Sequence, residues 1–332
     1  MFEGGIKLSL QTRSSPVLLG LVTKNRTQYR TRSRSRSNQS VTVQLSSILV
    51  QTDENGNLPE PNKIFTSGIS QRPRTQVPNQ LFSQPNTIGI LGGVSAFSTL
   101  IFLEKLVWWG SKSGGCPPFV VCNDSGLHME LPLFLSPFDS ITTKSVSSSN
   151  IENLRRQRVF LENSGASCIV MPCHISHVWH DEISEGSSLP FLHVGESVAK
   201  ELKEAKLKPL EVGSNVKIGV LASSAALGAG IYQEKLQNQG FEVVYPDKAT
   251  MEHVVIPAIE AVKRRDIKGA RNLLKIAVQI LLVRAVNTVL LTADEMQGVI
   301  PHDDPLLLRC TDPMDALARS TIRWAKSKQN MK

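Results

Sequence analysis

Short apolar runs alternate with longer amphipathic segments from about residue 87 onward. Runs of four or five apolar residues between Gly, Pro or polar residues predict buried strands, and apolar residues spaced three or four apart predict helices. The predicted strands are Thr87–Leu91, Phe119–Cys122, Cys168–Met171, Pro190–Val194, Lys217–Leu221, Phe241–Tyr245 and Thr288–Leu291. The predicted helices are Ser95–Trp108, Asn150–Ser164, Gly195–Ala205, Gly230–Gln239, Met251–Arg264, Ile267–Ala285 and a last helix after Asp312-Pro313. This alternation indicates βα units and a mainly parallel sheet.

The pattern also contains an internal repeat. Gly89–Leu106 (GILGGVSAFSTLIFLEKL) is similar to Gly219–Leu236 (GVLASSAALGAGIYQEKL) at an offset of 130, and both end in Glu-Lys-Leu. A second pair, Ala166–Cys173 and Val286–Ala293, consists of apolar strands offset by 120. Self-similarity over such lengths implies two similar structural units. We therefore predict an α/β fold with two pseudo-symmetric Rossmann-like domains, mainly parallel sheets and an interdomain cleft; a doubled scaffold without cleft chemistry is the alternative.

The predicted first domain covers residues 87–189 and is completed by residues 305–328, whereas the second covers residues 190–304. Residues 51–86 are rich in Pro, Gly, Asn, Gln and Ser with little periodicity, which predicts a disordered linker. Residues 1–50 are rich in Ser, Thr and Arg, with eight basic residues and one acidic residue. This composition predicts a transit peptide, so the expected location is the chloroplast, with the mitochondrion or cytoplasm as alternatives.

Charge adds little about the ligand of the folded part. The first 50 residues carry +7 of the total +8, so residues 51–332 are nearly neutral. The segment Arg30–Ser37, RTRSRSRS, has an alternative interpretation as an RNA-binding tract or a solvated tail. One such octamer is weak support, and no nucleic-acid partner is expected. No membrane partner is expected either, because no run approaches 18 apolar residues.

Cys173 is the first candidate for chemistry. It follows the predicted strand in GASCIVMPCHISH (165–177), at the carboxyl end where open α/β sheets place their ligands. A helix beginning there would lower the pKa of the thiol and make it a base or nucleophile near neutral pH. A buried structural cysteine is the alternative. The five cysteines are an odd number without paired spacing, which argues against a disulfide framework and favours a reducing compartment.

The repeat places a second loop opposite Cys173. If a pseudo-twofold axis relates the halves, the cleft is flanked by Cys173 on one side and by Thr292–Glu295 on the other. The small-residue loops Gly92–Ser95 and Ala222–Ala225 open helices and suit anion binding. The first loop does not match G-x-G-x-x-G, so a dinucleotide site is disfavoured. This arrangement suits chemistry that needs one group on each face of a small molecule.

Four stretches of the sequence show a family resemblance. GILGGV, MPCHISH, the Gly-Val-Leu-Ala-Ser-Ser strand and loop, and Asp-Pro-Met-Asp (312–315) resemble the aspartate/glutamate racemase family from about Thr87 to Trp324, as in a divergent plant-type member. The resemblance implies two pseudo-symmetric α/β domains, no cofactor, and a small-molecule amino acid or related carboxylic acid as substrate. It also implies two cysteines on opposite faces of the substrate, one removing the Cα proton and the other returning it.

The sequence departs from that family pattern at several positions. Cys173 matches the first cysteine, but the second is Ala293, so Asp294 is the candidate acid or base for the other face, with Glu295 next. Both carboxylates could instead cap the helix that they precede. His174-Ile175 replaces Asn-Thr, Ser224-Ala225-Ala226 replaces Thr-Gly-Thr, and the arginine for a side-chain carboxylate is missing. The predicted substrate-binding residues are Gly93, Ser95, His174, Ile175, Ser223, Ser224, Lys263 and Glu295.

The sequence is also compatible with other chemistries. Cys173, His177 and His180 share one helix face and could bind zinc, although no fourth ligand is evident and no metal is expected. Cys173 and His177 could also form a nucleophile and base. The stronger rival is a one-base enzyme, such as a decarboxylase or isomerase, or an inactive small-acid-binding protein. Phe97, Trp108 and Trp109 are expected to build core or a contact in a homodimer.

Overall fold

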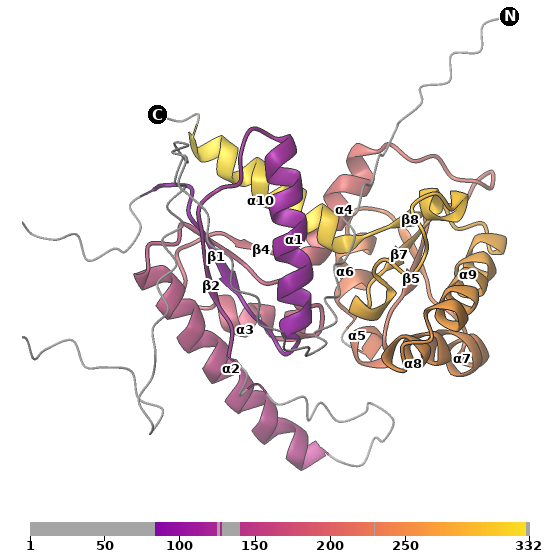
Figure 1. Cartoon of the computed structure of the whole chain (residues 1–332), viewed down its shortest axis with the longest axis horizontal. Coiled ribbons are helices and arrows are strands. Elements are labelled where there is room, and N and C mark those ends of the chain that lie inside the picture. The colour runs from indigo at the N-terminus through magenta and orange to yellow at the C-terminus, as the bar shows by residue number, and fades with distance from the viewer. Residues whose placement is uncertain (1–83, 125–126, 128–139, 229, 330–332) are drawn as a thin grey trace, which may run out of the picture. The chain divides into compact units, whose positions relative to one another are not determined.

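The structure, a computed structural model, describes residues 84–124, 127, 140–228 and 230–329 (Figure 1). The predicted transit peptide, the Arg-Ser tract and all but three residues of the predicted linker lie outside the described residues. They therefore stay predictions. No helix among the described residues is long and apolar enough to cross a membrane.

The strands form two four-stranded sheets in which every pair is parallel. The first sheet has the order β2 (Phe119–Cys122), β1 (Ile88–Leu91), β3 (Cys168–Val170) and β4 (Phe191–Leu192). The second sheet has the order β6 (Glu242–Val244), β5 (Lys217–Leu221), β7 (Thr288–Leu291) and β8 (Cys310–Thr311). The two orders are equivalent, with β5 in the place of β1 and β7 in the place of β3. The predicted fold class and the internal repeat are confirmed.

The strands at the centre of each sheet are apolar except for Lys217 and Thr288 at the start of β5 and β7, because helices cover both faces. Every residue of β1, β3 and β7 is buried. Sheets buried on both faces require such continuous apolar runs, which is why these strands could be predicted from sequence. β8 escaped prediction because a strand of two residues has no pattern of its own.

The connecting helices follow the predictions with local differences. Their bounds are α1 (Ala96–Lys112), α2 (Ser140–Asn163), α3 (His180–Ser184), α4 (Val194–Glu204), α5 (Ser224–Gly228), α6 (Ile231–Gln237), α7 (Lys248–Thr250), α8 (Ile256–Lys263), α9 (Ile267–Val283) and α10 (Pro313–Gln329). The single helix predicted over Met251–Arg264 is a π turn, η2 (Met251–Val255), followed by α8. Three 3₁₀ turns complete the order: η1 (Ile175–Trp179), η3 (Asp294–Met296) and η4 (Pro305–Arg309).

The sheet pairing differs from the predicted domain boundaries at both ends of the second domain. A boundary at residue 190 separates β4 from β3, with which it pairs, and a boundary at residue 305 separates β8 from β7. Each sheet therefore ends in a two-residue strand that the predicted boundaries assign to the other domain. The backbone hydrogen bonds of the sheet, rather than side-chain periodicity, decide where such short strands belong.

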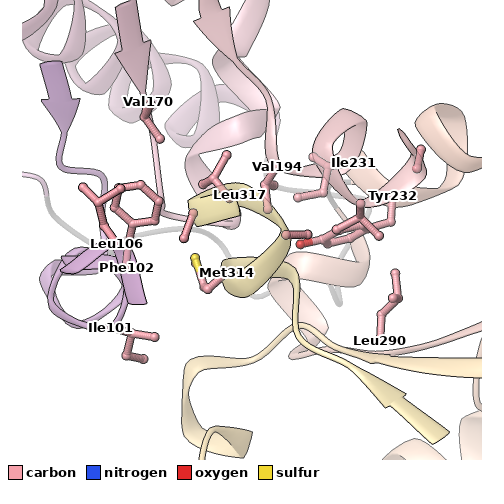
Figure 2. Close-up of a cluster of buried hydrophobic side chains, with 14 of the residues drawn as sticks. Ile101, Phe102, Leu106, Val170, Val194, Ile231, Tyr232, Leu290, Met314 and Leu317 are labelled. Atoms are coloured by element: carbon pink, nitrogen blue, oxygen red, sulfur yellow. The ribbon is translucent and has the colours of Figure 1, made fainter. Parts of the chain in front are cut away.

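One hydrophobic core joins the two sheets. It contains Ile90 of β1 together with Val220 of β5 and Leu290 of β7, and residues of α1, α4 and α10 fill the space between. Figure 2 shows labelled side chains of α1, β3, α4, α6 and β7 together with Met314 and Leu317 at the start of α10. Two further cores lie on other faces of the sheets. Burial of this shared core holds together the loops that form the candidate site.

A polar contact fixes the start of α10 to α1. Lys105 Nζ lies 2.5 Å from Asp312 Oδ2 and 3.3 Å from Asp315 Oδ2. Burial alone lowers the pKa of Lys105, but the two carboxylates outweigh it and the pKa is raised. Lys105 belongs to the repeated Glu-Lys-Leu and both carboxylates belong to Asp-Pro-Met-Asp. Two sequence signatures thus meet in one ion-pair cluster.

The aromatic residues of α1 have different environments. Trp109 packs against the shared core and its Nε1 donates to Asp315 Oδ1 at 2.7 Å. Trp108 is half-buried, with Lys112 Nζ 3.8 Å from the ring centroid. Phe97 is 57% exposed, so the prediction that it builds core is wrong. A role of Phe97 in a homodimer stays a prediction.

Candidate active site

The loops after β1 and β3 touch at Gly93. A Cβ at this position would lie 2.3 Å from Cys173 Cβ and 2.4 Å from Ser176 Oγ. Only glycine allows so close an approach. Two backbone groups of the same loop bind the partner turn, since Val94 N donates to Ser176 Oγ and Ser95 N to Cys173 Sγ. The predicted anion-binding loop therefore uses these N–H groups to hold the cysteine turn.

Cys173 sits at the N-terminus of α1. Its side chain is 1% exposed, and its sulfur accepts a hydrogen bond from Ser95 N at 3.4 Å. The helix predicted directly after Cys173 is only the 3₁₀ turn η1, so the prediction that the following helix faces the thiol is wrong. Instead α1, the 17-residue helix that follows β1, directs its N-terminus at the sulfur. A helix N-terminus favours negative charge on such an atom.

Cys173 has different neighbours from Cys168 and Cys310. Cys168 lies wholly within the shared core, and burial raises its pKa to about 12. Burial likewise raises the pKa of Cys310 to about 12. Cys173 belongs to none of the three hydrophobic cores, and its neighbours are the Gly93 loop and Ser176. Its surroundings are those of a polar turn.

Asp294 of the second sheet reaches the same helix terminus. It begins η3 after β7, and its Oδ2 accepts from Ser95 Oγ at 2.8 Å and from Ser98 Oγ at 2.5 Å. Ser95 Oγ in turn accepts from Ser98 N and caps α1. Ser95 thus donates a hydrogen bond to Cys173 through its N–H and another to Asp294 through its hydroxyl. The structure brings together the two predicted catalytic residues, which are 121 positions apart.

His174 is buried beside these groups. Its side chain is 4% exposed, and its Nδ1 lies 2.7 Å from the hydroxyl of Tyr232 on α6. Burial lowers the pKa of His174, and the nearby Asp294 carboxylate opposes this shift. Tyr232 and Ser98 had not been predicted as site residues. Ser98 is the third residue of α1, after the capping residue Ser95. Nothing in its residue type or its spacing indicated that Asp294 would reach it.

His177 has a structural role. Its Nδ1 lies 2.9 Å from the carbonyl oxygen of Cys173, and its Nε2 accepts from Val194 N at 3.2 Å. A carbonyl can only accept, so Nδ1 carries the proton and the ring is neutral. Both nitrogens are occupied by backbone, which leaves neither for the sulfur. The nucleophile–base pair of Cys173 and His177 is therefore wrong, and the same occupancy opposes zinc binding by His177.

No group of three or more His, Cys, Asp or Glu within the described ranges is arranged to hold a metal ion. This applies to His177, His180 and His193, whose rings nevertheless form a cluster. The centroid of His193 lies 4.5 Å from that of His177 and 4.8 Å from that of His180. His193 Nδ1 accepts from Gly195 N and caps α4. Burial lowers the pKa of His193 to about 3, assisted by His180 and Lys235 and opposed by Asp181.

We expect this histidine to make stability depend on pH. His193 is neutral in the folded chain but titrates near pH 6.5 when unfolded, so its contribution is complete above that pH. The contribution is lost as the pH falls from about 6.5 toward about 3. His193→Asn keeps a side chain that caps helices but cannot be protonated. Its urea midpoint should therefore fall less than the wild-type midpoint between about pH 7 and about pH 4.5.

The matched control is His253→Asn, which changes an exposed histidine on η2. It should leave the wild-type pH dependence unchanged. The same loss of stability on acidification in His193→Asn and in the wild type would show that His193 does not cause it.

The remaining predicted site residues have other contacts. Ile175 begins η1 and packs against the shared core. Ser223 Oγ accepts from Ala226 N and caps the first turn of α5, where Ser224 is exposed. Thr292 Oγ1 donates to Leu221 O, so the loops after β5 and β7 adjoin. No contact described for Ser223 or Ser224 joins either of them to Cys173 or Asp294.

Lys263 and Glu295 form the outer part of the Asp294 loop. Lys263 on α8 is about half-exposed, with its Nζ 3.2 Å from Glu260 Oε1 and 4.0 Å from Glu295 Oε1. Glu295 follows Asp294 in η3 and is partly exposed. The structure therefore places Lys263 beside Glu295, on the solvent side of the Asp294 loop.

Comparison with known proteins identifies the family of this chain. The family model described as Asp/Glu/Hydantoin racemase matches residues 118–321, which is more than half of the chain. The chain belongs to the Asp/Glu/hydantoin racemase family. The other strands of both sheets, Cys173 and Asp294 lie within the matched region, whereas β1, the Gly93 loop and the whole of α1 precede it.

A bacterial amino-acid racemase is similar to part of this chain. The broad specificity amino-acid racemase RacX of Bacillus subtilis (strain 168) is 29% identical over 164 residues, which are 48% of this chain and 64% of RacX. The match thus spans less than two thirds of that relative.

Two solved structures share the fold. The aspartate racemase of Picrophilus torridus superposes with a TM-score of 0.55 at 23% identity, covering 72% of this chain and 94% of that one. An aspartate racemase homologue from Pyrococcus horikoshii OT3 gives 0.56 at 18% identity, covering 73% and 99%. At these identities the similarity establishes the two-sheet fold of the family.

Proposed function

We propose that this chain racemises or epimerises an amino acid, or a related α-substituted acid, at Cα without a cofactor, using Cys173 on one face and Asp294 on the other. The observation that carries the proposal is the double contact of Ser95, with Cys173 Sγ through its N–H and with Asp294 Oδ2 through its hydroxyl. A thiol from the first sheet and a carboxylate from the second thereby meet at one helix terminus. Membership of the racemase family supports the reaction class.

The reaction balances without an added reagent. For one enantiomer, the Cys173 thiolate removes the Cα proton and the electron pair moves toward the substrate carboxylate. The protonated Asp294 then donates its proton to the opposite face of Cα. For the other enantiomer the two groups exchange roles. The Cα–H of an amino acid is a very weak acid, so the site must stabilise the developing negative charge.

The family's second thiol is replaced here by Ala293, which is 4% exposed and packs into the core of the second sheet. Asp294, the next residue, carries an ionisable group instead. Its Oδ2 receives two hydroxyl donors, but its Oδ1 is buried and has no hydrogen-bond donor among the described residues. This second oxygen is the one that we assign to proton transfer.

The experiment uses the full chain with individual L-amino acids in D₂O. If the chain racemises an amino acid, deuterium should appear at Cα and the D-isomer should form. Mass spectrometry measures the deuterium, and chiral chromatography detects the D-isomer. Two-base exchange places deuterium from solvent on the product because the donating group equilibrates with D₂O. Absence of both signals with every amino acid would contradict the proposal.

One observation favours a second candidate. Asp294 Oδ2 is held by two serine hydroxyls across the two sheets, which would also suit a carboxylate that only fastens η3 to α1. The chain would then be a one-base enzyme, such as a decarboxylase, or a small-acid-binding protein. Cα deuteration without inversion identifies the one-base enzyme. Thermal stabilisation by amino acids without deuteration identifies the binding protein.

A further inference from the structure

The contact between His174 and Tyr232 has no place in the reaction as described so far. Tyr232 is 2% exposed, and its ring lies in the core between the sheets, as Figure 2 shows. Its hydroxyl meets His174 Nδ1 at 2.7 Å. Burial raises the pKa of Tyr232 well above its ordinary value, so the hydroxyl keeps its proton. A core tyrosine thus holds a histidine that adjoins the proposed catalytic thiol.

The hydrogen bond determines which nitrogen of His174 carries the proton. If Nδ1 carried it, Tyr232 would accept, and its buried hydroxyl hydrogen would have no acceptor within the described part of the chain. A buried donor without an acceptor costs about 1–3 kcal/mol. If Tyr232 donates, Nδ1 accepts and the proton lies on Nε2. The second arrangement leaves the tyrosine satisfied.

This tautomer places an unused donor in the site. His174 Nε2 is buried and has no hydrogen-bond partner among the described residues. Asp294 Oδ1 is likewise buried without a partner, and its carboxylate is close enough to raise the pKa of His174 against the effect of burial. A donor and an acceptor, both desolvated and both unpaired, are the counterparts of a small polar ligand.

We propose that His174 Nε2–H donates a hydrogen bond to the substrate carboxylate and stabilises its developing charge, and that Tyr232 is the positioning residue that fixes this tautomer. The inference rests on the proposed function. When Cys173 removes the Cα proton, the electron pair enters the Cα–carboxylate bond and negative charge grows on the carboxylate oxygens. A preorganised N–H donor acts on that charge without reorganising. The proton stays on Nε2 throughout.

The surroundings of His174 favour the neutral ring that this role requires. Burial lowers its pKa, and His177 lies nearby as a neutral ring because both its nitrogens are bonded to backbone. Asp294 is the acidic group that opposes the shift. Asp312 lies near Tyr232 and, with burial and Asp294, keeps the phenol protonated. A neutral imidazole donates one N–H while leaving the other nitrogen to accept from Tyr232.

The first test measures the tautomer and the contact, independently of turnover. In the full chain with ¹⁵N-labelled histidine, the wild type should show Nε2 protonated and Nδ1 unprotonated for His174, assigned from the resonance lost in His174→Gln. Glycine, an amino acid without a side chain, is the probe. Its addition should shift the Nε2–H resonance of His174.

Tyr232→Phe removes the hydroxyl and should release the fixed tautomer, giving a mixed or exchanging signal. Its matched control is Tyr245→Phe, which changes a half-buried tyrosine on the loop after β6 and should leave the spectrum unchanged. A wild-type ring protonated on Nδ1, or a His174 resonance that glycine does not move, would overturn the inference. Thermal melting separates a misfolded variant from a folded one.

The second test uses the reaction. His174→Phe should lower kcat by about 10²–10³-fold, the effect of removing one donor to a developing oxyanion. His174→Gln, which retains an N–H donor, should keep more activity than His174→Phe, and Tyr232→Phe should lower kcat more than it raises KM. Unchanged kcat in His174→Phe would overturn the inference and leave the proposed function standing. A glycine-dependent shift without turnover of any amino acid would instead defeat the proposed function and leave only the contact between His174 and the carboxylate standing.

Discussion

Cys173→Ser is expected to slow deuterium exchange at Cα by about 10²–10⁴-fold, the range that general acid–base groups contribute. The serine oxygen can still accept the hydrogen bond from Ser95 N, so the turn held by Gly93 should keep its shape. A hydroxyl at this position is, however, a far poorer source of an anionic base than a thiol. The rate is measured by mass spectrometry of the amino acid after incubation in D₂O.

The control for this substitution is Cys116→Ser, which changes an exposed cysteine after α1. It should exchange hydrogen at the wild-type rate. Circular dichroism establishes that both variants are folded. If Cys173→Ser exchanged as fast as the wild type, the thiol would not be the base, and the family resemblance at MPCHISH would be one of fold alone.

Asp294→Asn is expected to slow inversion at Cα by about 10²-fold or more, while hydrogen exchange at one face of Cα persists. The amide keeps the size of the carboxylate and an oxygen that can accept from Ser95 and Ser98. It cannot carry a proton to and from Cα. With Cys173 intact, the L- or the D-amino acid, but not both, should still acquire deuterium without changing configuration. Chiral chromatography with mass detection distinguishes exchange from inversion.

Two further variants interpret that result. Asp303→Asn changes an exposed carboxylate between η3 and η4 and should racemise normally. Ala293→Cys in the Asp294→Asn background places a thiol at the family's second cysteine position and should restore inversion. Wild-type racemisation by Asp294→Asn, together with loss of inversion in Glu295→Gln, would transfer the second role to Glu295. Loss of cooperative unfolding in Asp294→Asn would instead indicate that Asp294 only fastens η3 to α1.

The sequence by itself determined the scaffold. The runs in β1, β5 and β7 are apolar apart from Lys217 and Thr288, because the central strands are covered on both faces, and such runs can be recognised without a structure. The repeat beginning at Gly89 and Gly219 then fixed the equivalence of the two sheets. Cys173 and Asp294 could be selected because they follow strand ends, where parallel sheets place their ligands.

Only the tertiary structure decided which groups these residues meet. The helix terminus facing Cys173 belongs to α1, because the loop at Gly93 lets two distant segments touch. His177, which its spacing made a candidate partner of the thiol, turns both nitrogens to backbone. Tyr232, which no motif singles out in the sequence, brings its hydroxyl to 2.7 Å from His174 Nδ1. Periodicity records which face of an element is buried, whereas hydrogen bonds between elements depend on packing that no local pattern encodes.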